Sequence, residues 1–161
     1  MPIIELKLLV LLIIANGVPI LARSLLGERW DFPLDADLLF VDGQPLLGQS
    51  KTVRGVLCTI VLTGAAAPLL GLAVGQGCLL AALSTLGDLL SSFIKRRLKL
   101  RPSSMALGLD QVPESLLPLL LLKEPLGLTW PGILRTVVLF FVLELVLSRL
   151  LFWLRIRKTP Y

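Results

Sequence analysis

The sequence predicts an all-α integral membrane protein with about five transmembrane helices. Of its 161 residues, 55% are hydrophobic, and the mean hydropathy of +0.86 lies above the value near or below zero that is usual for soluble domains. Four apolar runs are each about 19–23 residues long, which is enough to cross ~30 Å of hydrocarbon. These runs are residues 3–22, 53–74, 76–94 and 132–154.

The first run is expected to remain in the protein as a membrane helix and not to be removed as a signal peptide. It carries Glu5 ahead of Lys7, and Pro19 lies inside it with no clear small-residue cleavage site after it. A secretory signal instead places its positive charge first and ends at small residues. The second and third runs meet the same length criterion, and a tight turn around residues 75–77 joins them.

The fourth helix is predicted to be irregular, over residues 107–122. This run is shorter than the others and contains acids and prolines, namely Asp110, Pro113, Glu114 and Pro118. The fifth helix, residues 132–154, carries Glu144 near its middle, and we expect this acid to line a cavity or to pair with Asn16 or Arg135. No repeat or linker divides the chain, so residues 1–161 form one domain.

The distribution of lysine and arginine predicts the topology. Five crossings place alternate loops on opposite sides, and all of the 16 basic residues except Lys7, Lys123 and Arg135 then fall on one side. Cytoplasmic loops carry an excess of Lys and Arg. We therefore expect a multi-pass protein of the cell (inner) membrane, with the N-terminus outside and with loops 23–52 and 95–108 and the C-terminus in the cytoplasm. The net charge of +5 then needs no nucleic-acid partner.

The third helix carries an acid inside its apolar run. Residues three, four and seven positions from Asp88 share its helical face. These residues are Ser84, Thr85, Ser91, Ser92 and Lys95. Arg97, nine positions on, points away from this face. A carboxylate in hydrocarbon is costly unless it faces a partner or water, so Asp88 indicates either a functional site or an ion pair that steadies helix packing.

A second acid, Asp110, begins the irregular fourth run and is expected near the cytoplasmic level of Asp88. Two carboxylates flanked by Lys and Arg suit Mg²⁺ and phosphate, because Mg²⁺ takes one or two protein carboxylates and completes its shell with phosphate oxygens and water. The cations then neutralise the remaining phosphate charge. The alternative for Asp110 alone is that it caps the fourth helix, as Asp does well.

The segment GQSKTVRG, residues 48–55, supplies further cations before the second helix. Lys51 and Arg54 are three residues apart and share a face where that helix begins, and a helix N-terminus is an anion site. The alternative is that the two residues are ordinary cytoplasmic anchors. Taken together, two acids, two basic clusters and a row of hydroxyls at one membrane surface fit chemistry between a nucleotide and a lipid phosphate.

With these features the sequence resembles the CDP-archaeol synthase family, which is related to the phosphatidate cytidylyltransferases. The resemblance covers nearly the whole chain and is carried by four motifs in order: NGVP at 16–19, DG and GQSKTVRG within 42–55, GDLLSSFIKRR at 87–97, and LDQ at 109–111. It implies a Mg²⁺-dependent transfer of CMP from CTP to a membrane lipid phosphate, with release of pyrophosphate.

The resemblance also implies roles for individual residues. Asp88 and Asp110 would be catalytic metal ligands, and Lys95 would be catalytic through its contact with phosphate. The residues implied to bind the substrates are Lys51, Arg54, Ser91, Ser92, Arg96 and Arg97. The family often has an acid three residues after the LDQ aspartate, whereas position 113 here is proline, so either Glu114 takes that role or the role is lost.

Two alternative functions predict different features. A phosphotransferase acting on CDP-lipids would be expected to show a denser aspartate signature on one helix. A small non-enzymatic transporter or assembly subunit would use Asp88, Glu144 and Lys95 as ion or lipid contacts, and it predicts no dependence on CTP. The small size of the bundle also raises the prospect of a homodimer, in which a second copy would cover Glu144.

Overall fold

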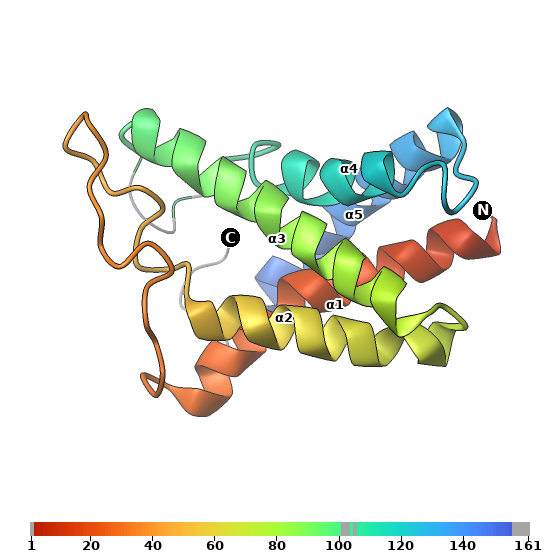
Figure 1. Ribbon diagram of the computed structural model, residues 1–161, viewed down its shortest axis with the longest axis horizontal. Helices are drawn as coiled ribbons and strands as arrows, with labels where there is room; N and C mark the ends of the chain where they lie inside the picture. The colour runs from red at the N-terminus through yellow and green to blue at the C-terminus, as the bar shows by residue number, and fades with distance from the viewer. Residues whose placement is uncertain (1, 101–103, 105, 156–161) are drawn as a thin grey trace.

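The computed structural model describes residues 2–100, 104 and 106–155. Within these ranges the chain is helical, with two isolated β-bridges in the segment between the first two helices and no strand. The elements are α1 (Ile3–Leu26), α2 (Val53–Ala66), η1 (Ala67–Leu70), α3 (Val74–Arg97), α4 (Gln111–Leu121) and α5 (Trp130–Trp153) (Figure 1). The prediction of an all-α protein with five helices is confirmed.

Successive helices run in alternating directions along the long axis of the molecule (Figure 1). The segment between α1 and α2, the segment between α3 and α4 and the end of α5 therefore lie at one end, and the start of α1 lies at the other. We call the end of the molecule where the two segments and the end of α5 lie the loop end. This is the alternation that the charge distribution predicts, and the assignment of the loop end to the cytoplasm stays a prediction of the positive-inside rule.

Four helical segments of the described chain are long and apolar enough to cross a membrane, namely α1, Val53–Leu70, α3 and α5. Residues 67–70 continue α2 as a tighter turn because Pro68 cannot donate to the helix ladder, and Gly71 ends the segment at φ +71°. The helices α1 and α3 extend three or four residues further at the loop end than the apolar runs alone predict.

The fourth helix is much shorter than a membrane span. It has 11 residues and is therefore ~16 Å long, about half of the hydrocarbon thickness. It begins at Gln111 and not at residue 107, after a turn in which Gly108 adopts φ +81°. Figure 1 shows α4 starting beside the middle of α3, so the chain enters the bundle from the loop end before the helix begins.

Glycines let neighbouring helices approach closely, as is common in membrane bundles. A Cβ atom added at Gly77 would lie 2.6 Å from Ala67 Cβ and 2.9 Å from the Thr63 carbonyl oxygen, so α3 packs directly on the end of α2. A Cβ added at Gly87 would lie 2.3 Å from the Pro113 carbonyl oxygen. The first turn of α4 therefore rests on α3 one residue before Asp88.

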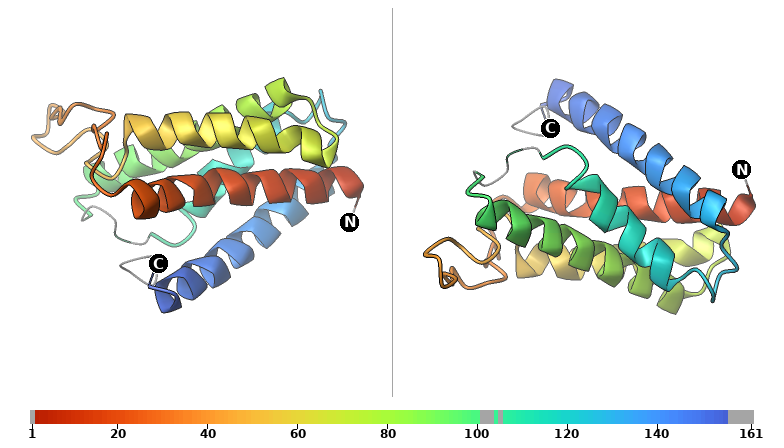
Figure 2. Two further views of the ribbon diagram at one scale, coloured as in Figure 1. Left: turned by 90° about the horizontal axis from the view of Figure 1, so that it is seen from below. Right: turned by 90° about the horizontal axis from the view of Figure 1, so that it is seen from above.

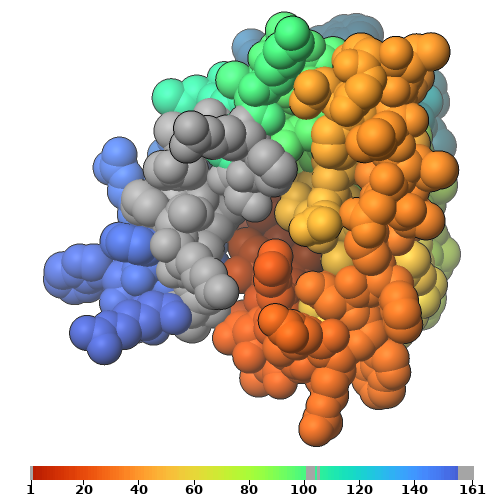
Figure 3. Space-filling view, turned by 90° about the vertical axis from the view of Figure 1, so that its left-hand side faces the viewer, coloured from red at the N-terminus to blue at the C-terminus, as the bar shows by residue number. Residues whose placement is uncertain are grey.

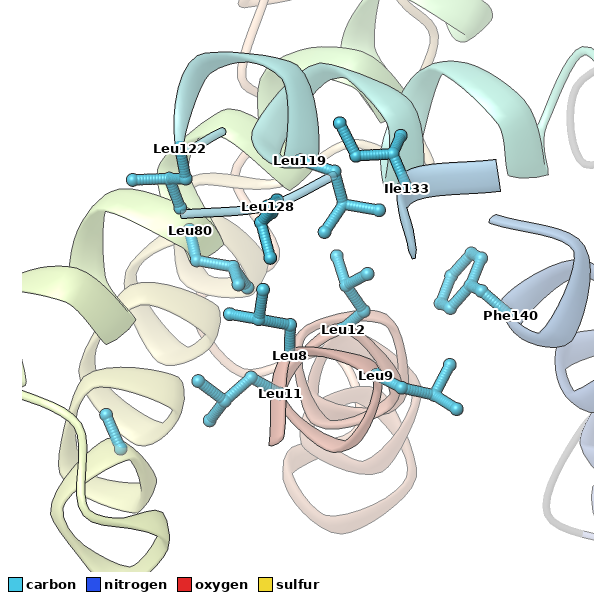
Figure 4. Close-up of a cluster of buried hydrophobic side chains, with 11 residues drawn as sticks. Leu8, Leu9, Leu11, Leu12, Leu80, Leu119, Leu122, Leu128, Ile133 and Phe140 are labelled. Carbon is cyan, nitrogen blue, oxygen red and sulfur yellow. The ribbon is translucent and has the colours of Figure 1, made fainter. Parts of the chain in front are cut away.

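The apolar core surrounds α1. Leucines 8, 11 and 12 of this helix are at most 1% exposed, and Figure 4 shows them meeting side chains from the other elements. The partners in this cluster are Leu80, Leu119, Leu122, Leu128, Ile133 and Phe140. The first half of α5 packs against this core, while its second half diverges from α1 (Figure 2). The bundle is consequently tight at one end and open at the loop end.

Candidate active site

A polar cavity of about 570 Å³ opens at the loop end of the bundle. It is lined by the second half of α1, residues 47–52, the start of α2, one face of α3, and the start of α4. Figure 3 looks at this end and shows a hollow with α1 visible at its floor, between the 23–52 segment and the beginning of α2. The predicted site residues on its wall are Lys51, Arg54, Asp88, Ser92, Lys95, Arg96 and Asp110.

The first ion pair of the cavity joins Lys51 to Asp88. The Lys51 Nζ atom lies 2.6 Å from Asp88 Oδ2, although the two residues are 37 positions apart in the chain. Burial alone would lower the pKa of the Lys51 ammonium, but the Asp88 carboxylate outweighs burial and the pKa lies above its ordinary value. Lys51 is therefore charged at neutral pH and compensates the carboxylate that the sequence places inside an apolar helix.

The second ion pair joins Lys95 to Asp110. The Lys95 Nζ atom lies 2.6 Å from Asp110 Oδ1 and donates to the Ser104 carbonyl oxygen at 3.2 Å. The other Asp110 oxygen accepts the Ala106 backbone N–H at 3.0 Å, and its side chain makes no capping bond to α4. Asp110 therefore stands at the N-cap position of α4 but does not cap the helix through its side chain.

A third carboxylate, Glu114, lies in the wall of the same cavity. The side chain is buried, and the Asn16 amide nitrogen donates to Glu114 Oε2 at 3.0 Å across 98 positions of sequence. The chain therefore has a third carboxylate at the site, one position after Pro113. The sequence suggests Asn16 as a candidate partner of Glu144, and the structure shows its amide bonded to Glu114.

Arg54 is buried in the cavity wall and closes the 23–52 segment onto α2. One guanidinium nitrogen donates to the carbonyl oxygens of Gly27 and Arg29, and the other lies 2.8 Å from Asp31 Oδ1. The Thr52 hydroxyl accepts the Gly55 N–H at 3.1 Å and caps α2. Arg54 therefore positions the segment that carries Lys51, and its predicted contact with substrate stays a prediction.

Of the remaining residues predicted to bind substrate, two line the cavity and two lie outside it. Ser92 and Arg96 line the cavity, whereas Ser91 is fully buried and donates to the Gly87 carbonyl oxygen of its own helix at 2.9 Å. Arg97 points away, as the helical phase predicts.

Arg97 acts as an anchor for the 23–52 segment. Its guanidinium carbon lies 4.5 Å from the ring centre of Phe40 and 4.8 Å from that of Phe93. It also donates to the Pro45 carbonyl oxygen at 2.6 Å and pairs with Asp42 at 3.3 Å. Neither Ser91 nor Arg97 is among the residues that line the cavity, so the structure does not bring these two predicted substrate ligands to it.

The donor set is compatible with Mg²⁺. No group of three or more His, Cys, Asp or Glu residues arranged to hold a metal occurs in the described part of the chain. Mg²⁺ in nucleotide sites needs only one or two protein carboxylates, since phosphates and water complete its shell. Asp88 and Asp110 are two such carboxylates on one cavity wall, so the residues present fit the ion.

The fold and the cavity define a charged site enclosed by membrane-length helices. Four membrane-length helices surround it, and five cations and five carboxylates line it. Comparison with known proteins gives the family. Residues 3–161 match the family model described as CarS-like CDP-archaeol synthase, and the chain belongs to this family.

Two relatives match this chain along most of their length. A CDP-archaeol synthase of Pyrobaculum calidifontis is 34% identical over 92% of this chain and 91% of its own. One of Sulfurisphaera tokodaii is 33% identical over 80% of this chain and 81% of its own. A solved structure of an intramembrane enzyme for archaeal membrane lipid biosynthesis is 29% identical, with a TM-score of 0.75 over 88% of this chain and 90% of that one.

These likenesses confirm the predicted family and the prediction of a multi-pass protein of the cell membrane. They also favour the enzyme over the alternative of a non-enzymatic transporter or assembly subunit, because the family and the solved structure are both enzymatic.

Proposed function

We propose that this protein transfers CMP from CTP to the phosphate of an archaeal membrane lipid, yielding a CDP-lipid and pyrophosphate. The observation that supports this most directly is the pair of Lys–Asp contacts, Lys51–Asp88 and Lys95–Asp110, on the wall of one intramembrane cavity. The lysines of this wall can bind the negative phosphates of a nucleotide and of a lipid phosphate. The aspartates can bind the divalent cation that accompanies the nucleotide.

The ion pairs let the site exchange partners without leaving a charge uncompensated. In the structure each lysine lies 2.6 Å from its carboxylate. When substrate enters, Lys51 and Lys95 can release the carboxylates and bind phosphate oxygens, while Asp88 and Asp110 become available as Mg²⁺ ligands. Arg96 on the same wall adds a further cation for phosphate.

Phosphoryl transfer needs positioning and charge stabilisation more than covalent help from the protein. An oxygen of the lipid phosphate forms a bond to the α-phosphorus of CTP, and the bond from that phosphorus to the bridging oxygen breaks to release pyrophosphate. The attacking oxygen is already ionised at neutral pH, so no general base is required and a chain without histidine suffices. Mg²⁺, when bound, would neutralise phosphate charge and polarise the α-phosphoryl group.

The roles of the side chains follow from their charge. Lys51, Lys95 and Arg96 would stabilise the negative charge that spreads over the transferring phosphoryl group and the departing pyrophosphate. The Asn16 amide holds the Glu114 carboxylate in place. Glu114 would thus add a third negative charge beside Asp88 and Asp110, the proposed Mg²⁺ ligands.

The test uses purified protein in detergent with Mg²⁺, radiolabelled CTP and a panel of ether- and ester-linked lipid phosphates. The Asp88→Asn and Asp110→Asn variants are compared with Glu124→Gln, which removes an exposed acid outside the cavity. We expect lipid-linked CMP from the parent and from Glu124→Gln, and a loss of about 100-fold or more in each cavity variant. Absence of product with every lipid, together with no Mg²⁺-dependent CTP binding, would refute the proposal. The lipid that reacts best would identify the substrate.

A further inference from the structure

A second cavity, of about 300 Å³, lies between α1 and α5. We call it the α1–α5 groove. Its lining is almost wholly apolar and comes from residues 13–21 of α1 and residues 140–151 of α5. Two polar side chains, Asn16 and Glu144, line both this groove and the polar cavity. The two spaces therefore meet at these residues.

Building on the proposed function, we infer that the α1–α5 groove seats a hydrocarbon chain of the lipid phosphate and is the lateral entrance through which that substrate reaches the polar cavity. The occupant must be an amphiphile, because one end of the joined space is apolar and the other is lined by Lys51, Lys95 and Arg96. A lipid phosphate has this division of polarity, whereas CTP alone has no apolar part for the groove.

The groove exists because α5 diverges from α1 beyond Phe140. Phe140 is the last fully buried apolar residue of α5, and Val146 and Leu150 in its second half are about half exposed. Figure 2 shows the two helices separating toward the loop end. On the opposite wall Gly17 has no atom within 4 Å of the position that a Cβ would take. Because Gly17 has no side chain, the space beside it in the groove stays open.

The groove is expected to orient the lipid more than to attract it. A chain that moves from the bilayer into an apolar groove exchanges one apolar surrounding for another, so it gains little from the hydrophobic effect. What the groove supplies is a fixed path for the chain, and hence a fixed position for the attached phosphate near the α-phosphorus of CTP. A blocked groove should therefore impair reaction of the lipid and leave CTP binding intact.

The primary variant is Gly17→Phe, which fills the groove from α1 without a clash at its Cβ. The matched control is Val61→Phe, which adds the same ring on the exposed face of α2. We expect Gly17→Phe to lower kcat/KM for a long-chain lipid phosphate by about tenfold or more, with less than about a twofold change for a short-chain analogue and for CTP affinity. Val61→Phe should match the parent throughout.

A second variant, Leu151→Trp, narrows the groove from α5 and guards against a folding defect peculiar to position 17. Binding of radiolabelled long-chain lipid phosphate without CTP adds a readout that does not depend on turnover. Parent-like binding and kinetics in both variants would overturn the inference. A changed oligomeric state with unchanged lipid kinetics would overturn it too, and would make the groove an interface between two copies. A parent that binds lipid phosphate through the groove but makes no CDP-lipid would refute the proposed function alone.

Discussion

Replacing Gly87 by alanine tests whether the close contact between α3 and α4 assembles the site. A Cβ at this position would lie 2.3 Å from the Pro113 carbonyl oxygen, 2.6 Å from the Pro113 carbonyl carbon and 2.8 Å from Glu114 Cα. All three atoms belong to the backbone of α4, so no flexible side chain can give way. Ordinary contact begins at 3.4 Å, and α4 must therefore move by about 1 Å in a close-packed interior.

The cost of this movement can be placed within limits. Overpacking of a helix contact typically destabilises a protein by about 1–3 kcal/mol. The movement also displaces Asp110 and Glu114, which α4 and the preceding turn carry to the cavity. Since a misplacement of ~1 Å can lower activity ~100-fold, we expect Gly87→Ala to lose activity more severely than stability.

Gly75→Ala is the matched control, because this glycine lies in the first turn of the same helix and has no atom within 4 Å of an added Cβ. Thermal unfolding in detergent and CDP-lipid synthesis are measured for both variants. Gly75→Ala should equal the parent or be slightly more stable, since alanine favours helix by up to ~1 kcal/mol over glycine. If Gly87→Ala retained parental stability and activity, the contact between α3 and α4 would not position the site.

Two further predictions concern the 23–52 segment. Burial would raise the pKa of Asp35, but hydrogen bonds from the backbone N–H groups of Gly48, Leu47 and Asp37 outweigh burial and lower the pKa. The ionised Asp35 therefore stabilises the folded protein at neutral pH, and this contribution fades as pH falls below ~4. Asp35→Asn should lower the free energy of unfolding by about 1–2 kcal/mol at pH 7 and less at pH 3.5, and a constant difference would contradict this. Arg97→Met should speed proteolysis within residues 23–52 and weaken CTP binding by about 1 kcal/mol or more, whereas Arg149→Met, at an exposed site on α5, should do neither.

The local pattern of the chain was sufficient to predict the helices and one face of the site. The lengths of the apolar runs predict α1, α2, α3 and α5, because helix formation in a membrane depends on residues within one segment. The spacing around Asp88 also predicts the side of α3 that carries Ser92 and Lys95 and excludes Arg97, since 100° per residue is a local property of the helix.

The tertiary structure decided which distant groups meet. The short α4, the two Lys–Asp pairs and the Asn16–Glu114 contact depend on packing between residues up to 98 positions apart. The Gly87 contact sets where α4 begins, and the divergence of α5 opens the α1–α5 groove. The spacing of residues along one helix predicts none of these contacts, because a helix can present the same face to several neighbours. Only the close packing of the bundle selects the neighbour, and with it the cavity where two carboxylates and their lysines meet.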